Sequence, residues 1–221
     1  MSTISENLRR LKEEIPADVI LIAVSKFHPV EALMEAYDAG QRYFGESRVQ
    51  EFLEKVKQMP DDVKWHFIGH LQTNKVKQII GKTSLIESVD TERLLMLIDS
   101  ESEKAGVITN VLMQVHVARE ETKFGFSEEE INEFFSNRRF ENLKATHICG
   151  IMGMASNTDD ENLVRSDFRR IAAIYNNIKA NSSLGLRGFD FLSMGMSGDW
   201  KIAVEEGSDM VRIGSAIFGP R

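Results

Sequence analysis

The sequence predicts an α/β protein, a single (β/α)₈ TIM barrel preceded by an extra N-terminal helix. Short apolar runs alternate with helical patterns along the 221 residues, and this alternation is typical of a parallel sheet covered by helices. The runs can be counted as eight strands, the number that closes a barrel. The length agrees, because barrels of this class commonly run to about 200–250 residues as one domain.

The first elements carry clear start and stop signals. Residues 3–14 have the amphipathic spacing of a helix. Residues 19–24 form an uninterrupted apolar run, which is typical of a strand buried on both faces in a parallel sheet. Pro29 lies where the next helix should begin, and Gly40 lies where it should end.

The same unit then repeats to the end of the chain. The remaining strand candidates are residues 42–44, 64–68, 85–89, 110–115, 145–151, 189–193 and 210–213. Two helices are expected to begin with a capping box, formed by Ser127 with Glu130 and by Thr158 with Glu161.

No linker or composition shift divides the chain, so we expect one domain over residues 1–221. The alternative fold is an open doubly wound sheet, whose usual Gly-x-Gly-x-x-Gly loop is absent after the first strand. The barrel is the better prediction.

Composition argues against several classes of protein. The chain has 27 Lys+Arg and 34 Asp+Glu, a formal net charge of −7, and this overall field disfavours nucleic acids and acidic membranes as partners. The single cysteine, Cys149, excludes an internal disulfide and a thiolate-rich zinc site. The charged N-terminus does not match a signal peptide, and no apolar run reaches the roughly 18–20 residues that span a bilayer. We therefore expect a cytoplasmic protein.

Polar and glycine residues gather at the expected C-terminal ends of the strands, where such barrels form their active sites. Lys26 follows the aliphatic first strand, so its amine should emerge into a partly desolvated mouth. Desolvation disfavours the ammonium form, as a nucleophilic Schiff-base lysine requires. The alternative is a lysine that extends into solvent at a strand end. Most of the ten methionines are expected in the core, although four at the rim could line a flat ligand: Met152, Met154, Met194 and Met196.

The ends of the last two strands suggest an anion site. Ser197, Gly198 and Asp199 precede one helix, and Gly214 and Ser215 precede another turn. Both places can offer backbone N–H groups and hydroxyls, and barrels frequently bind phosphate there. Glycine and serine also make ordinary turns and caps, but their presence at both loops favours phosphate binding.

Arg212 alternates with Val211 and Ile213 along the last strand, so it points either into the barrel or toward the helices. A buried guanidinium needs a partner. We expect that partner to be a carboxylate such as Glu46 or Glu87, or a ligand atom.

The histidines do not predict a metal site. His66 and His70 are four residues apart, which on a strand is roughly 13 Å and too far to share one ion. His28, His116 and His147 are isolated and are expected to be surface residues or core residues with a hydrogen-bond partner.

Seven short fragments at the expected strand ends match the motifs of a known protein family, and they occur in the same order. They are Ala-Val-Ser-Lys at 23–26, Phe-Gly-Glu at 44–46, Trp-His-Phe-Ile-Gly at 65–69, Ser-Val-Asp at 88–90, Gly-Ile-Met-Gly-Met at 150–154, Leu-Ser-Met-Gly-Met-Ser at 192–197 and Val-Arg-Ile-Gly at 211–214. Together they resemble the pyridoxal phosphate homeostasis protein family. The resemblance spans about residues 19–219, and although each fragment is weak alone, the ordered set is highly specific.

The resemblance implies the fold of the alanine racemase N-terminal domain (fold type III), with pyridoxal 5′-phosphate (PLP) held as a covalent aldimine, or Schiff base, on Lys26. It implies that Ser197, Gly214 and Ser215 grip the phosphate, and that Arg212 faces the pyridine nitrogen. That pairing keeps the nitrogen unprotonated and makes the ring a weaker electron sink. The cofactor-binding residues expected on this basis are Lys26, Ser47, His66, Ser193, Gly195, Ser197, Arg212, Gly214 and Ser215.

Two positions depart from the family pattern. Ser47 and Arg48 follow Phe-Gly-Glu where the family usually has Asn and Tyr, and His116 stands where Asn is common. Ser47 keeps a hydroxyl but lacks the donors and the carbonyl of an amide. If this position contacts the cofactor, binding is expected to be altered.

The resemblance implies a carrier or regulator in PLP (vitamin B6) homeostasis rather than a classical enzyme. Such a protein binds PLP, limits its free aldehyde and supplies it to apo-PLP enzymes. The sequence stops at Arg221, soon after the last strand, so we expect no second domain, an open PLP face and no acid/base residue opposite it. A monomer is expected.

Three alternatives stay open at this point. The first is a PLP-dependent amino-acid racemase or a related enzyme of small amino acids. The second is a barrel enzyme without PLP, in which Lys26 forms an aldolase-type Schiff base with a phosphorylated sugar. The third is a protein-binding scaffold with a vestigial PLP site. The presence of Ser47 and Arg48 in place of the usual Asn and Tyr is consistent with this interpretation.

Overall fold

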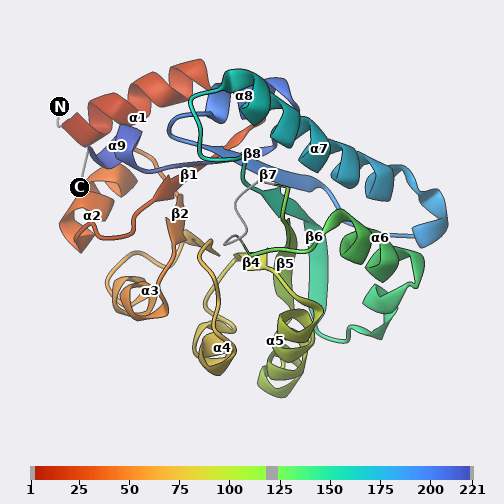
Figure 1. Cartoon of the computed structure of the whole chain (residues 1–221). Helices are drawn as coiled ribbons and strands as arrows, with labels where there is room; N and C mark the ends of the chain where they lie inside the picture. Colours follow the sequence, from red (N-terminus) through yellow and green to blue (C-terminus); the bar gives the residue numbers. More distant parts are fainter. Residues whose placement is uncertain (1–2, 118–123, 220–221) are drawn as a thin grey trace.

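The chain folds into a parallel barrel surrounded by helices, as the sequence predicts (Figure 1). This computed structural model describes residues 3–117 and 124–219. The strands are β1 (Ile20–Val24), β2 (Tyr43–Glu46), β3 (Lys64–Phe67), β4 (Leu85–Val89), β5 (Thr109–Val115), β6 (Thr146–Gly153), β7 (Phe191–Met196) and β8 (Met210–Ile213). Over the described residues these eight strands pair in sequence order, and β8 pairs with β1 to close the barrel. All predicted strands are confirmed, with ends that differ by at most three residues.

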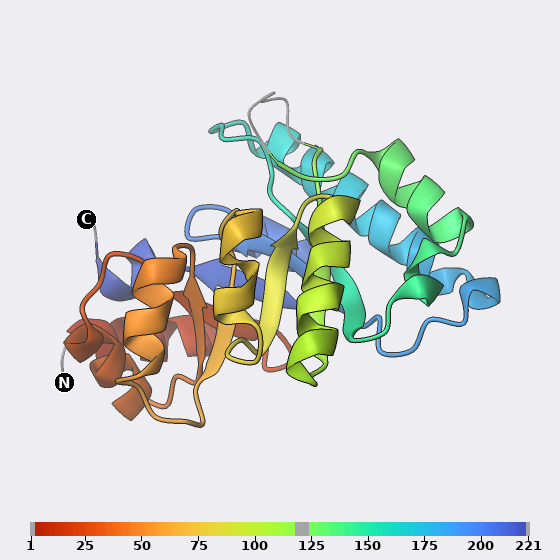
Figure 2. The same ribbon diagram turned by 90° about the horizontal axis from the view of Figure 1, so that it is seen from below.

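Helices form the outer layer, and the two views show them around the strands (Figures 1 and 2). They are α1 (Thr3–Glu14), α2 (Val30–Asp38), α3 (Val49–Val56), α4 (Val76–Ile79), α5 (Glu92–Ala105), α6 (Glu128–Ser136), α7 (Glu161–Ala180), α8 (Trp200–Glu205) and α9 (Ser215–Phe218). Short 3₁₀ turns lie in the connections: η1 (Thr73–Lys75), η2 (Arg139–Asn142) and η3 (Ser182–Leu184). Within the described part of the chain, no helix is both long and apolar enough to cross a membrane.

The N-terminal helix α1 covers residues 3–14, as predicted, and packs against α2 and α9. The side chain of Asn7 donates a hydrogen bond to the backbone oxygen of Ile217 at 3.0 Å. The first and last helices therefore lie side by side on the outside of the barrel (Figure 1).

Most of the apolar core lies between the strands and the helices. Side chains alternate along each strand, so Phe44 and Phe67 face outward into the same apolar cluster as Phe52 of α3, and all three are completely buried. A smaller apolar cluster fills the barrel interior: Ile22, Leu85, Leu112, Cys149, Met152 and Met210. The interior is therefore packed with side chains and is not an open channel.

One β-bulge bends β6. Val111 of β5 pairs with Ile148, whereas the next residue, Leu112, pairs with Gly150, so one extra residue is inserted in β6. Gly150 has φ 151°, and a Cβ at this position would collide with the backbone of Phe191. This position requires glycine because the backbone of the next strand approaches too closely for a side chain.

One predicted helix start is confirmed and the other is wrong. Ser127 and Glu130 form the reciprocal capping box at the start of α6. At α7 the cap is Asp160, whose carboxylate accepts from the N–H groups of Asn162 and Leu163, and Thr158 accepts only from the N–H of Asp160. The helix begins later than predicted because an aspartate directly before the first turn caps it. Glu161 is then the first helical residue, too early to act in a capping box.

Candidate functional site

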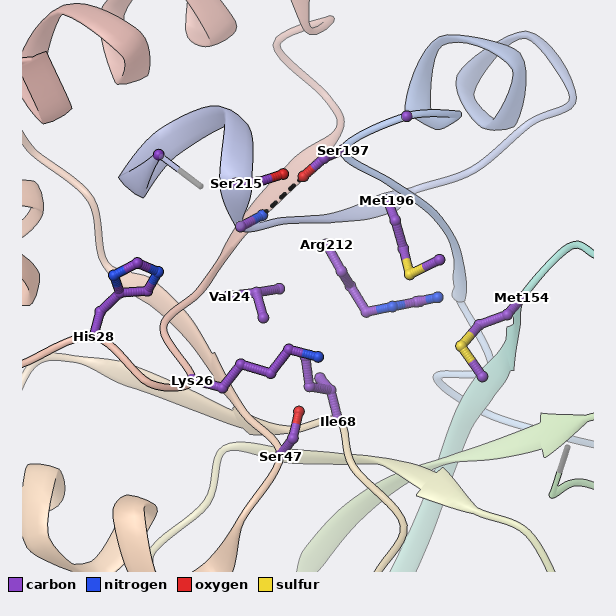
Figure 3. A pocket seen from close by; sticks show the side chains of 13 residues that line it. Val24, Lys26, His28, Ser47, Ile68, Met154, Met196, Ser197, Arg212 and Ser215 are labelled. Carbon is purple, nitrogen blue, oxygen red and sulfur yellow. Dashed lines mark hydrogen bonds between the residues drawn. The ribbon is translucent and has the colours of Figure 1, made fainter. Parts of the chain in front are cut away.

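A cavity of about 390 Å³ opens at the C-terminal ends of the strands (Figure 3). Its lining residues come from loops that lie far apart in the sequence: Val24, Lys26, His28, Ser47, Ile68, Met154, Met196, Ser197, Gly198, Arg212, Gly214, Ser215 and Gly219. The cavity is thus at the end of the barrel where the sequence predicted a site.

Lys26 enters the cavity from the loop that follows β1. Because side chains alternate, Val24 and Lys26 face the cavity while the residue between them faces the helices. Figure 3 shows the Lys26 side chain extended into the cavity between Ser47 and Arg212. A primary amine therefore lies within the cavity, beside a hydroxyl group.

The loops after β7 and β8 bring two hydroxyl groups together on one side of the cavity (Figure 3). Ser197 Oγ accepts a hydrogen bond from the Gly214 N–H at 3.2 Å, which ties the two loops to each other. The turn after β7 is closed by Asp199, whose carboxylate accepts from the Met196 N–H. Ser215 begins α9 directly after Gly214. This side of the cavity has the hydroxyl-rich, glycine-rich composition of an anion site.

The Arg212 side chain lies on the opposite face of β8 from those of Val211 and Ile213. It points into the barrel, where Arg212 is 4% exposed. Its guanidinium donates to the carbonyl of Gly153 at 2.9 Å and to the hydroxyl of Ser193, and it lies 3.6 Å from Glu87 Oε2. Of the two carboxylates expected as its partner, the structure therefore selects Glu87. Glu46 faces the helices and pairs with Lys55 of α3.

Beneath the cavity, Arg212 belongs to a buried network with Glu87, His66 and Ser193, which we call the inner cluster. Glu87 Oε1 lies 2.6 Å from His66 Nδ1, and Glu87 Oε2 accepts from Ser193 Oγ at 2.6 Å. Burial works to raise the pKa of Glu87, but His66 and Arg212 hold it below its usual range. Burial lowers the pKa of the Arg212 guanidinium, and Glu87 opposes that shift. The guanidinium is therefore fixed in position by its own protein partners.

The predicted cofactor-binding residues fall into three groups. Six of them line the cavity: Lys26, Ser47, Ser197, Arg212, Gly214 and Ser215. His66 and Ser193 lie beneath it in the inner cluster. Gly195 has φ 91° and packs closely against Trp200 and Ala203 of α8, so it shapes the end of β7.

His70 and His147 have partners of their own, whereas His116 Nδ1 is buried without a hydrogen-bond partner among the described residues, so the expectation of a hydrogen-bonded histidine fails there. His70 Nδ1 lies 2.6 Å from Asp90 Oδ2, and its ring stacks on Phe124 with 3.8 Å between the ring centroids. His147 Nε2 lies 2.6 Å from the backbone oxygen of Arg187. His66 and His70 therefore each bind a different carboxylate.

Sequence reasoning did not place His28, Ile68 or Gly219 in the cavity wall. His28, predicted to be a surface or core residue, stacks on Phe218 of α9 with the ring centroids 4.8 Å apart. Its position two residues after Lys26 was the one available signal. The rim methionines Met154 and Met196, which the sequence singled out, do line the cavity.

Three kinds of group thus converge on one cavity. A primary amine can react with an electrophilic carbon, hydroxyls beside a glycine loop can hold an anion, and a fixed guanidinium can face a ring acceptor. This donor set can hold a small anionic ligand that carries an electrophilic carbon, and it is consistent with the ligand that the family resemblance implies.

Comparison with known sequences gives a consistent result. The sequence-family model of the alanine racemase N-terminal domain matches residues 1–221. A pyridoxal phosphate homeostasis protein of Schizosaccharomyces pombe is 42% identical over 100% of this chain and 94% of its own length. One of Aquifex aeolicus is 39% identical over 91% of this chain and 86% of its own length.

Comparison with solved structures agrees. PipY of Synechococcus elongatus, 33% identical, covers 98% of this chain and 100% of its own, with TM-scores of 0.92 for the form without PLP and 0.89 for the form with PLP bound. Alanine racemase from E. faecalis has a TM-score of 0.74 at 18% identity, covering 99% of this chain and 58% of that one. This last likeness shows the fold alone.

Proposed function

The chain belongs to the pyridoxal phosphate homeostasis protein family, and on that premise we propose that it binds PLP in the barrel cavity and acts in PLP homeostasis as a carrier or regulator. The support comes from two sides. Relatives that cover 91–100% of the chain are named pyridoxal phosphate homeostasis proteins, and the similar PipY structure was solved with PLP bound.

The observation that carries the proposal is the matching of three groups in one cavity. Lys26 suits the aldehyde, the Ser197–Gly214–Ser215 side suits the phosphate, and Arg212 suits the pyridine nitrogen. When bound, PLP supplies an aldehyde that reacts with amines and a conjugated ring that withdraws electrons.

We place the covalent link on Lys26. Lys26 would supply the primary amine that holds the aldehyde of PLP, with loss of water. Ser47 lies beside Lys26 in the cavity and offers a single hydroxyl to the same region (Figure 3). The phosphate would be held by the hydroxyls of Ser197 and Ser215 and by the backbone at Gly214.

Arg212 bears on the electronic properties that PLP would have in this cavity. Its guanidinium is buried and held by Glu87, Ser193 and Gly153, so it stays a cation at neutral pH. A cation held at this position would disfavour protonation of the pyridine nitrogen of bound PLP and would weaken the ring as an electron sink. Arg212 would thus limit the chemistry of the cofactor.

The test of PLP binding is a visible absorption spectrum of the purified protein with PLP, before and after borohydride, beside Lys26→Ala. We expect a Schiff-base band in the wild type that borohydride removes, and no such band in the variant. Absence of the band in the wild type with excess PLP would overturn the proposal.

The test of the carrier role is cofactor transfer. The loaded protein is expected to reactivate an apo-PLP enzyme while leaving the chirality of free amino acids unchanged. A time-dependent change in amino-acid chirality that Lys26→Ala abolishes would instead establish the racemase alternative.

A further inference from the structure

Three charged side chains lie outside the barrel against the loop that carries Lys26. They are Glu46 at the end of β2, and Glu51 and Lys55 of α3, which we call the outer cluster. The side chains of Glu46 and Lys55 are 0% and 7% exposed, and that of Glu51 is 21% exposed. These charges are thus largely removed from water beside the cavity without lining it.

Lys55 is the centre of the outer cluster. Its ammonium donates to Glu46 Oε1 at 2.7 Å, to the backbone oxygen of Ser25 at 2.8 Å and to Glu51 Oε2 at 3.4 Å. An ammonium group has three N–H donors, so these contacts use all of them. Lys55 is therefore built to hold its neighbours in place and not to react.

The outer cluster forms hydrogen bonds with the backbone on both sides of Lys26. The Ser25 carbonyl, which belongs to the peptide unit before Lys26, accepts from Lys55, and the Ser25 hydroxyl donates to Glu46 Oε1 at 2.6 Å. The Phe27 N–H, which belongs to the peptide unit after Lys26, donates to Glu51 Oε2 at 2.8 Å. Because peptide units are planar, holding both units restricts the two backbone dihedrals of Lys26 and thereby the direction of its Cα–Cβ bond.

The conformation of Phe27 shows that this stretch of backbone is held under constraint. Its φ is 68°, in the left-handed region that residues other than Gly, Asn and Asp rarely adopt. The Glu51 hydrogen bond holds the N–H of Phe27, and the Arg48 guanidinium lies 4.5 Å from the centre of its ring. Such outliers persist where surrounding contacts determine them, and they cluster at functional sites.

We propose that Glu51 and Lys55, supported by Glu46, are positioning residues that aim the Lys26 amine into the cavity for covalent capture of an aldehyde. This inference rests on the proposed function, since it concerns how Lys26 meets PLP. The outer cluster contacts the Lys26 loop, whereas the hydroxyls expected to hold the phosphate lie on the loops after β7 and β8. Its loss should therefore weaken covalent capture and spare non-covalent binding.

The test compares two ligands on three variants of α3. PLP can form the covalent link, whereas pyridoxine 5′-phosphate carries a hydroxymethyl group in place of the aldehyde and cannot. Glu51→Ala is expected to weaken PLP binding about tenfold by removing the Phe27 hydrogen bond. Glu51→Gln keeps an acceptor oxygen and should bind PLP within about twofold of wild type. The matched control is Glu54→Ala, an exposed glutamate of the same helix, which should bind PLP as wild type does.

A second variant removes the buried pair together. Glu46→Leu with Lys55→Met leaves no unpaired buried charge, so the fold is expected to survive, as checked by circular dichroism and thermal denaturation. This double variant should bind PLP at least tenfold more weakly and be trapped by borohydride more slowly. All variants should bind pyridoxine 5′-phosphate, measured by calorimetry, within about twofold of wild type.

Each outcome decides the matter. Selective loss of PLP capture with rescue by Glu51→Gln supports the positioning role. Unchanged PLP affinity and trapping rate in Glu51→Ala and in the double variant would overturn it, and so would an equal loss for both ligands, which would indicate a general packing role. If wild type itself captures no PLP, the proposed function fails, which is a distinct result.

Discussion

The inner and outer clusters each bury a glutamate completely, yet they shift its pKa in opposite directions. Both oxygens of Glu87 have partners, from His66 and Ser193, and Arg212 lies nearby, so its pKa falls despite burial. In Glu46, burial raises the pKa although Lys55 and Ser25 oppose that shift. Both of those partners bond to Oε1, and Oε2 has no hydrogen-bond partner among the described residues. Each carboxylate has two hydrogen-bond partners, so the neighbouring charges separate the two cases: Arg212 adds a second favourable group beside Glu87, whereas the Glu51 carboxylate adds to the effect of burial and raises the pKa of Glu46.

The two clusters also act on the cavity in different ways. The inner cluster holds a side chain that lines the cavity, Arg212, by its charged end. The outer cluster holds the backbone on either side of Lys26, whose side chain lines the cavity. Substitutions in the inner cluster should therefore change both stability and the ligand's environment, whereas those in the outer cluster should change how Lys26 is presented.

The largest expected effect is on stability, from Glu87→Ala. This change leaves Arg212 and His66 buried without their carboxylate, and breaking a buried pair in this way costs about 3–5 kcal/mol. Urea denaturation at neutral pH measures the change. The exposed Glu54→Ala should alter the free energy of unfolding by less than about 0.5 kcal/mol. A similarly small effect for Glu87→Ala would contradict the inner cluster as a paired charge network.

The opposite pKa shifts predict opposite dependences of stability on pH. The pKa of Glu87 is lower in the folded state, so its contribution is present above the unfolded value, about 4.3, and is lost as the pH falls through the folded value. The pKa of Glu46 is higher in the folded state, so its contribution is complete below about 4.3 and is lost as the pH rises through the folded value.

Glu87→Gln should therefore reduce the decrease in the free energy of unfolding as the pH falls. Glu46→Gln should reduce the decrease in the free energy of unfolding that accompanies a rise in pH. Denaturation curves at a series of pH values for wild type and both variants measure the two slopes. A change of slope with the same sign in both variants would break the comparison.

A smaller effect is expected on ligand binding from Arg212→Lys. Lysine keeps the charge but cannot donate to Gly153 and Ser193 in the same fork, so PLP affinity should fall about tenfold, or about 1.4 kcal/mol. The absorption maximum of the bound cofactor should shift as well. In Glu51→Ala the band should weaken without moving, and a shifted band there would contradict the division between the two clusters.

The smallest effect is expected from Arg48→Ala. The Arg48 side chain is 63% exposed, lies 3.7 Å from Glu51 and covers the ring of Phe27. Contacts of this exposed kind contribute less than about 1 kcal/mol. Denaturation and PLP titration should both remain near wild type, and a tenfold loss of PLP affinity would place Arg48 among the positioning residues.

The sequence predicted the barrel well because strands buried on both faces leave uninterrupted apolar runs, such as residues 19–24. It predicted the rim as well, since polar and glycine residues must follow those runs for the cavity to form. Six of the nine expected cofactor residues line one cavity, although their roles stay predictions until a ligand is bound.

Contacts between elements could not be predicted in the same way. The choice between Glu46 and Glu87 as the partner of Arg212 depends on which residues of β2 and β4 face inward, a property of register. Lys55 lies within a helix that otherwise looks amphipathic, and nothing in the sequence marks it as buried beneath Ser25. The start of α7 was missed because Asp160 competes with Thr158 as the cap.

Lys26, and not its buried neighbour Lys55, is expected to be the amine that captures PLP. The most direct test is to reduce the loaded protein with borohydride, digest it and locate the pyridoxyl group by peptide mass mapping. We expect a single modified residue, Lys26, because Lys55 spends its three donors on Glu46, Glu51 and Ser25. A pyridoxyl group on Lys55 or on another lysine, with Lys26 unmodified, would contradict the account.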